Sequence, residues 1–303
     1  MGIFQWCIIK MEGRIVRADA RCLVCHMNQA LRVFDKYMRS EEEKWERLKN
    51  VMVVLQKAKW GMKPIEIAEV LYPALEEMVN VRDVYEQEKR RSNEMAEKML
   101  KKFGEIIKSS MDPLYDAAKL AIAGNLIDLG TPNWNEDSVY KKISEILQKP
   151  FGINDYEVFK EELSRASSIL YIVDNAGEIV FDRFFIEVMK EYNENIDVVV
   201  AAKSKPIIND ATVLEAAEIM EGVAEVIDSG MTIPGTIVER GSDRFRKLFF
   251  NSDIVVSKGQ GNFEGIVGES GGNVYFLLTV KCDVVSDFLK VPVGSMVFMK
   301  KKE

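Results

Sequence analysis

The stretch that decides the fold is Ser168-Ile-Leu-Tyr-Ile-Val173, followed at once by Asp174-Asn-Ala-Gly-Glu178. A short, continuous apolar run rich in β-branched and aromatic residues is typical of a strand that is buried on both faces, as in a parallel sheet. The polar turn after it leads into a helical pattern that starts near Ile179. The sequence therefore predicts a strand-to-helix unit whose connecting turn carries a carboxylate and an amide.

Similar units follow along the rest of the chain. We expect strands at 168–173, 196–202, 224–227, 253–256, 273–281 and 295–299. Helical patterns fall between them at 179–193, 212–220, 242–250 and 284–289. Strands that alternate with helices are typical of a doubly wound sheet. This part is expected to be a mainly parallel, Rossmann-like α/β/α domain.

The part before it has a different pattern. From about Met27 to Leu147, apolar residues recur at steps of three and four between charged ones, which is the period of amphipathic helices. Glycine and proline interrupt this period at several points, as between separate helices. We therefore expect an all-helical domain at 1–160 that covers a cleft, and a metal-binding α/β domain at 161–303.

Composition limits the class of protein. The 303 residues are 47% hydrophobic, which supplies a full core without disulfides. The formal net charge of -7, with both signs interspersed, argues against a nucleic-acid partner. No apolar stretch approaches the roughly 20 residues of a membrane span, and the N-terminus lacks the features of a signal peptide. We expect a cytoplasmic protein with no membrane partner and with reduced cysteines.

Polar side chains follow three of the predicted strands. Asp174 and Asn175 come after the first, Asn209 and Asp210 follow the second, and Ser257-Lys-Gly-Gln-Gly-Asn262 follows a third. In open α/β sheets, the carboxyl ends of parallel strands form the edge where ligands bind. Two carboxylates and an amide suit a hard divalent cation. The alternative for each turn alone is ordinary helix capping, for which Asp, Asn and Thr are common.

Lys258 is the candidate phosphate-binding residue. Gly259 and Gly261 would let backbone N–H groups approach an oxyanion, and the ammonium would offset charge in the transition state. A solvent-facing lysine in a glycine-rich turn is the alternative. A dinucleotide fingerprint beginning at Gly259 is rejected because 263–272 is too short and glycine-rich for the required crossover helix.

The remaining residues narrow the chemistry. His26 is the only histidine, and it lies in the helical part. A histidine-based catalytic triad or a phosphohistidine mechanism therefore has a single candidate, which lies outside the α/β part. Ala176 stands where an aspartyl-phosphate phosphatase would place its second aspartate. A water activated on a metal is the nucleophile that remains.

In these residues the chain resembles the metal-dependent damage-control phosphatases, a family also called ARMT-like and long filed as a domain of unknown function. The resemblance covers most of the chain from Arg17 onward. It is carried by Asp174-Asn-Ala-Gly-Glu178 with Asp182, Lys203-x-x-Pro206 with Asn209-Asp210-Ala-Thr212, Asp228-Ser-Gly with Ile233-Pro-Gly-Thr236, Ser257-Lys-Gly-Gln-Gly-Asn-Phe-Glu264, Asp112-Pro-Leu and Gly124-Asn-Leu-Ile-Asp128.

The resemblance implies a function and a set of roles. The family hydrolyses small phosphate esters, including sugar phosphates and damaged metabolites, with Mn, Co, Ni or Mg. It implies metal ligands at Asp174, Asn175 and Asp210, and a phosphate clamp at Lys258. Glu178 would orient substrate or transfer a proton. The expected substrate-binding residues are Lys258, Gly259, Asn262, Asn125, Asp128 and Asn209. Some members have Lys-Gly-Asp-Leu-Asn where this chain has Lys258-Gly-Gln-Gly-Asn262. The missing loop carboxylate changes which groups of a substrate the site can hydrogen-bond.

Two alternatives are kept. The family name records an S-adenosylmethionine-dependent carboxyl methyltransferase activity, although Asp174-Asn-Ala-Gly177 offers a single glycine for the cofactor loop. The other is a non-catalytic thiol or metal module, in which Cys22, Cys25 and Cys282 form a second site. Two partly buried thiols without a ligand are the simpler interpretation of Cys22 and Cys25.

Overall fold

The computed structural model describes residues 14–124 and 135–302. The helices are α1 (Ala20–Tyr37), α2 (Glu41–Leu55), α3 (Pro64–Val79), α4 (Glu86–Lys108), α5 (Pro113–Ala123), α6 (Glu136–Leu147), α7 (Tyr156–Leu163), α8 (Glu178–Tyr192), α9 (Val213–Ile219), α10 (Asp243–Asn251), α11 (Gly259–Ile266) and α12 (Asp283–Leu289), with the 3-10 turn η2 (Val238–Arg240). The strands are β1 (Ile153–Asn154), β2 (Ser168–Ile172), β3 (Asp197–Ala202), β4 (Glu225–Asp228), β5 (Ile254–Lys258), β6 (Val274–Thr279) and β7 (Met296–Lys300). Within these ranges, every helix is too short or too polar to cross a membrane.

The strands form one sheet in the order β1-β7-β6-β5-β2-β3-β4. Neighbouring strands run parallel except β6 and β7, which are antiparallel. The mainly parallel sheet that the sequence predicts is confirmed, with the predicted strands within a few residues of their observed bounds. The short edge strand β1 was not predicted, because two residues are too few to show a period.

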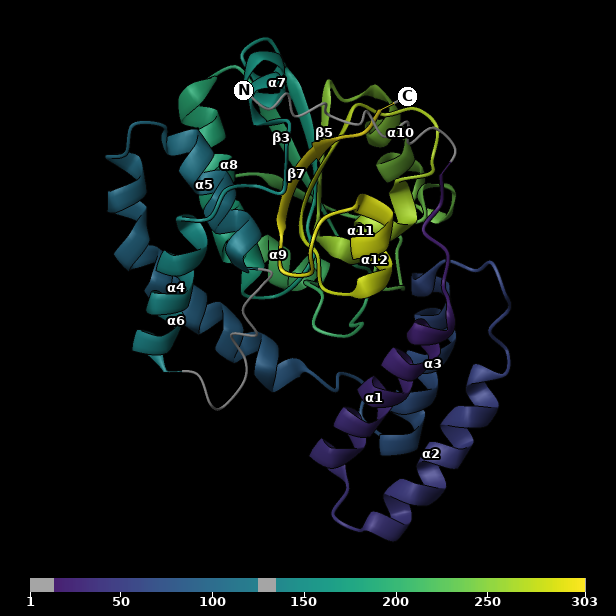
Figure 1. Cartoon of the computed structure of the whole chain (residues 1–303). Helices are drawn as coiled ribbons and strands as arrows, with labels where there is room; N and C mark the ends of the chain where they lie inside the picture. The colour runs from purple at the N-terminus through teal and green to yellow at the C-terminus, as the bar shows by residue number, and fades with distance from the viewer. Residues whose placement is uncertain (1–13, 125–134, 303) are drawn as a thin grey trace, which may run out of the picture.

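The sheet is covered on both faces because its strands are apolar on both. In β2, Ile169 and Tyr171 belong to the buried cluster that includes side chains of α4 to α8. Leu170 and Ile172 belong to the opposite cluster, with side chains of α10, α11 and α12. This alternation follows from the pleat of a strand, and it produces three layers. Figure 1 shows α5 and α8 on one side of the strands and α11 and α12 on the other.

The helical part does not behave as one unit. Helices α1 to α3 share a buried cluster of their own, whereas α4, α5 and α6 contribute to the cluster on the sheet. Figure 1 shows α1, α2 and α3 together beside the sheet layers. The sheet also begins before the expected boundary at 160, because β1 lies at Ile153–Asn154 and pairs with β7. The boundary itself stays a prediction.

One expectation is wrong at β5. The segment after it, expected as a glycine-rich loop with no room for a crossover helix, contains α11, which starts at Gly259 and connects β5 to the parallel β6. Its glycines allow close packing. A Cβ on Gly261 would lie 2.5 Å from the carbonyl oxygen of Pro234, and one on Gly265 would lie 1.8 Å from that of Thr236. These contacts with neighbouring backbone explain the glycines at positions 261 and 265 of α11. The sequence pattern does not show them.

We predict that Gly265→Ala lowers the free energy of unfolding by at least about 3 kcal/mol, because α11 must move away from the Thr236 carbonyl. Gly104→Ala in α4 is the matched control. Its Cβ would meet side-chain atoms at 3.7 Å or more, so helix propensity should raise stability by up to about 1 kcal/mol. Urea unfolding measures both, and equal effects would contradict the packing argument.

Candidate functional site

The polar turns meet at the carboxyl ends of β2, β3 and β5. Ile172 is in register with Ala201 of β3 on one side and with Ser257 of β5 on the other. The chain proceeds from β2 outward to β3 and β4, then returns to β5 on the other side of β2. This point is the topological switch of the sheet, where open α/β folds bind ligands.

The structure brings Asp174, Asn175 and Asp210 together. Asn175 and Asp210 form a short antiparallel bridge between the two strand-to-helix turns. The Ala211 amide donates to the carbonyl of Asp174 at 2.8 Å, and the Ala176 amide donates to the carbonyl of Asn209 at 2.9 Å. The two turns are therefore held side by side through their backbones, as the convergence of strand ends predicts.

Asp174 and Asp210 are both buried, and their negative charges repel each other. Burial raises the pKa of Asp210 to about 8, and the charge of Asp174 adds to this increase. Lys203 acts in the opposite direction, because its Nζ lies 3.5 Å from Oδ2 of Asp210. Oδ2 of Asp210 is buried and accepts no hydrogen bond from the part of the chain that the structure describes. Asp174 is also buried and accepts a hydrogen bond from Nδ2 of Asn175 at 2.6 Å. A cation between two such groups would relieve their repulsion.

The residues fit a divalent metal by their chemistry. Two carboxylates and an amide oxygen are hard donors, and Mg and Mn sites commonly have few protein ligands and several open positions. No three His, Cys, Asp or Glu side chains within 14–124 and 135–302 are grouped closely enough to hold a metal by themselves. The expected ligand set does not need three such residues, since one ligand is Asn175. The assignment stays a prediction.

Gly259 lies directly against Asp174. A Cβ on Gly259 would be 1.9 Å from Oδ2 of Asp174, and the backbone there has φ +76, which also favours glycine. The N-terminus of α11 thus borders the carboxylate. The sequence does not predict this contact. It requires a glycine at position 259 for steric reasons, in addition to the substrate binding that is expected of Gly259.

Lys258 is not on the surface. It is completely buried, and its ammonium lies 2.6 Å from Oε1 of Glu178, 2.5 Å from Oδ1 of Asp182 and 3.1 Å from the carbonyl oxygen of Ala121. Burial alone would lower the pKa of Lys258, but the two carboxylates raise it, so the lysine stays charged. Its three donors are matched by three acceptors. A phosphate can bind Lys258 only by replacing one of them.

The other expected substrate residues have different surroundings. Asn262 is fully buried, and its Nδ2 donates to the carbonyls of Val173 and Lys258 at 3.0 and 2.7 Å, which ties β2 to β5. Asn209 is partly exposed beside Asp210. Asn125 and Asp128 lie outside the described residues. Contact of these side chains with substrate stays a prediction.

Three buried charged residues at the site were not assigned from the sequence. Lys203 donates to the carbonyl of Gly235 at 2.6 Å and faces Asp210. Asp182 holds Lys258 and accepts from the Tyr171 hydroxyl at 2.8 Å. Burial raises the pKa of Glu264 to about 7, and Gln260 donates to it at 2.8 Å. Lys203 directly follows the predicted strand at 196–202, which was a usable signal. Asp182 and Glu264 sit inside helices, where sequence gives no sign of burial.

The thiols lie near this site but form no disulfide. Cys22 is buried in α1, Cys25 is exposed one turn later, and Cys282 precedes α12. Gln29 donates to Sγ of Cys25 at 3.6 Å and Gln260 donates to Sγ of Cys282 at 3.4 Å. Burial raises the pKa of Cys22 to about 11, and a thiolate at Cys282 would add to the shift. Burial also raises the pKa of Cys25 above its ordinary value. Cys22 and Cys25 are therefore protonated at neutral pH, and the expected second site stays a prediction.

Comparison with known proteins gives a consistent result. A family model described as the damage-control phosphatase ARMT1-like domain matches residues 18–297. A damage-control phosphatase from Pyrococcus horikoshii is 32% identical over 95% of this chain and 99% of its own length. Another, from Archaeoglobus fulgidus, is 33% identical over 78% of this chain and 83% of its own. The crystal structure of a DUF89 family protein from Pyrococcus horikoshii superimposes with a TM-score of 0.87 at 32% identity, covering 94% of this chain and 99% of that one.

We predict that Glu264→Gln makes stability less dependent on pH. The folded state raises the pKa of this carboxyl above its ordinary value of 4.5, so the folded protein holds the proton more tightly. Its contribution to stability is full below about pH 4.5 and is lost as pH rises toward 7, at about 1.4 kcal/mol per pH unit. Urea unfolding of metal-free protein from pH 5 to 8 measures the difference. A variant that keeps the slope of the parent protein would refute the assignment.

Proposed function

The chain belongs to the ARMT1-like damage-control phosphatase family, and we propose that it hydrolyses small phosphate esters with the help of a divalent metal. The substrates are sugar phosphates or damaged phosphorylated metabolites. When bound, Mn, Co, Ni or Mg supplies an activated water and neutralises charge on the phosphoryl group.

One observation carries the proposal. Asp174 and Asp210 are buried on adjoining turns at the switch point of the sheet, and each carboxylate disfavours the charge of the other. A protein keeps such a pair when a cation compensates it. Asp174, Asn175 and Asp210 are the proposed ligands, with their remaining coordination positions left for water and substrate.

Three buried side chains are assigned to the phosphate and its protons. Lys258 binds a phosphate oxygen in exchange for one of its present acceptors. Glu178, which accepts from both Lys258 and Asn175, is the acceptor to be exchanged, because it lies between the ammonium and the proposed ligands. Once released, Glu178 orients substrate or transfers a proton. Asp182 keeps Lys258 in place during the exchange.

The site residues suit a small substrate. Gly259 has no side chain where its backbone borders Asp174, and Asn209 lies partly exposed on the neighbouring turn. We assign both to the substrate, together with Asn262, Asn125 and Asp128. The net charge of -7 gives no attraction for a large polyanion, so recognition depends on the local lysines.

We predict that Asp174→Asn lowers kcat/KM for para-nitrophenyl phosphate with Mn²⁺ by roughly 10³-fold, because a charged ligand is lost. Asp243→Asn, the same change at an exposed position in α10, should leave the rate unchanged. The assay is run with chelator, then with each metal.

The same preparation tests the methyltransferase alternative. Calorimetry with S-adenosylmethionine and no metal should show no binding. Tight binding of this cofactor, together with phosphatase rates that are indifferent to Mn²⁺ and to Asp174→Asn, would overturn the proposed function.

A further inference from the structure

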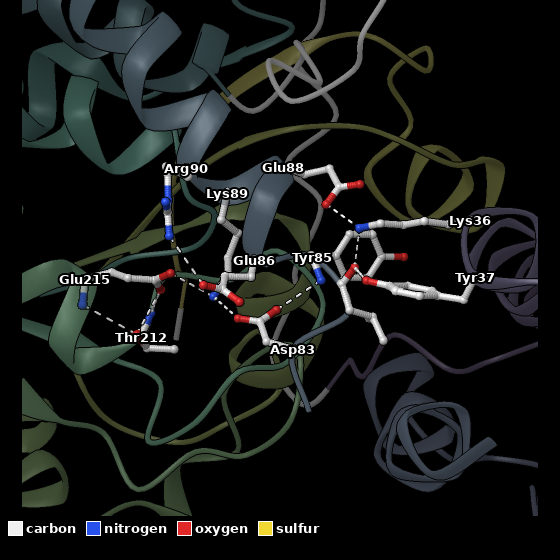
Figure 2. A network of polar contacts seen from close by, with 11 residues as sticks. Lys36, Tyr37, Asp83, Tyr85, Glu86, Glu88, Lys89, Arg90, Thr212 and Glu215 are labelled. Carbon is white, nitrogen blue, oxygen red and sulfur yellow. Dashed lines mark hydrogen bonds and ion pairs between the residues drawn. The ribbon is translucent and has the colours of Figure 1, made fainter. Parts of the chain in front are cut away.

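A buried lysine lies between the helical part and the proposed metal site. Lys89, in the first turn of α4, is 2% exposed, and its Nζ is 2.7 Å from Oδ2 of Asp83 and 2.8 Å from Oε1 of Glu215. Figure 2 shows the lysine between these two carboxylates. Burial would lower its pKa, but the two carboxylates raise it above the ordinary value. The first turn of a helix disfavours a cation, so these partners also offset the helix dipole.

Glu215 connects Lys89 to the turn that carries Asp210. Its other oxygen, Oε2, accepts from both the amide and the hydroxyl of Thr212 at 2.8 Å (Figure 2). Thr212 is the N-cap of α9 and lies two residues after Asp210. The ion pair with Lys89 thus restrains the cap, and the cap restrains the turn.

The same face of α4 also holds the other turn. Asn93 lies four residues after Lys89, which is about one helical turn, so the two side chains share a face. Oδ1 of Asn93 accepts from the amide of Gly177 at 2.6 Å. Gly177 is the N-cap of α8 and lies two residues after Asn175. One face of α4 therefore contacts one of the two turns through Asn93 and is connected to the other through Lys89 and Glu215.

A third anchor comes from α1 to α3. Ile207, three residues before Asp210, is buried in the apolar cluster of these helices. The amide of Asp210 donates to the carbonyl of Ile207 at 3.1 Å, so the turn is compact. The position of Asp210 thus depends on residues far from it in the sequence.

We propose that Lys89 and Asn93 are positioning residues, which set the distance between Asp174 with Asn175 and Asp210 for metal binding. This inference rests on the proposed function. Lys89 acts through Glu215 and the cap residue Thr212, and Asn93 acts through the cap residue Gly177. Groups that orient ligands in this way typically change metal affinity by 10- to 100-fold when removed.

The test is calorimetric titration of metal-free protein with Mn²⁺, using Lys89→Met and the control Lys36→Met. Lys36 lies 2.5 Å from Glu88 and 2.6 Å from the carbonyl of Val84, at the same end of α4 but on the α1 side (Figure 2). Lys89→Met should raise the Kd for Mn²⁺ at least 10-fold, and Lys36→Met should change it less than twofold. Lys89→Arg should restore the Kd to within threefold.

Two milder variants keep the test decisive if Lys89→Met does not fold. Glu215→Gln retains a side chain able to cap Thr212 but loses the charge that pairs with Lys89, and it should raise the Kd at least threefold. Asn93→Ala should raise it about 10-fold. In each case kcat should recover at saturating Mn²⁺, because the ligands themselves remain.

The possible failures are distinguishable. If Glu215→Gln and Asn93→Ala fold and bind Mn²⁺ as the parent protein does, the positioning role is wrong and the proposed function stands. A loss of thermal stability with an unchanged Kd leads to the same conclusion. If the parent protein binds no Mn²⁺, the proposed function falls and this inference falls with it.

Discussion

The repulsion between two buried carboxylates is the constraint on which the site depends. Asp174 and Asp210 lie on turns joined by a short bridge, and little water reaches them. Charges of the same sign are costly in such a place unless a cation is near. Lys203 supplies part of that compensation at 3.5 Å from Asp210. The charge of Lys281 also acts against the raised pKa of Asp210. A divalent metal held by both carboxylates, as proposed, would add to this compensation.

The rest of the fold keeps these charges in place. Asn262, itself buried, links the end of β2 to the end of β5 through two carbonyls. Gly259 allows α11 to start against the Asp174 carboxylate, and Gly261 and Gly265 let this helix approach neighbouring backbone. On the opposite side, Lys258 lies among Glu178, Asp182 and a carbonyl. The carboxylates that hold Lys258 of β5 therefore come from another element, α8.

The helical part takes an active place in this arrangement. Helices α4, α5 and α6 cover the sheet, while α1, α2 and α3 form a cluster that also buries Ile207 of the turn before Asp210. Lys89 and Asn93 extend the same connection through caps of α9 and α8. These contacts connect the helical part to the sheet part, and the division into two domains stays a prediction. The turns that carry the proposed ligands are held from both parts.

The sequence by itself determined the class of fold and the residues to examine. Periodicity identified β2 to β7 and the helices α8, α9, α10 and α12, and the polar turns after β2 and β3 predicted that Asp174, Asn175 and Asp210 converge. Local patterns suffice there because strand ends in a parallel sheet share one edge. Only the tertiary structure showed that Lys258 is buried between carboxylates, that α11 exists, and that Lys89 reaches Glu215. These facts depend on contacts between residues far apart in the chain, and no local period encodes burial or pairing of a single charged side chain.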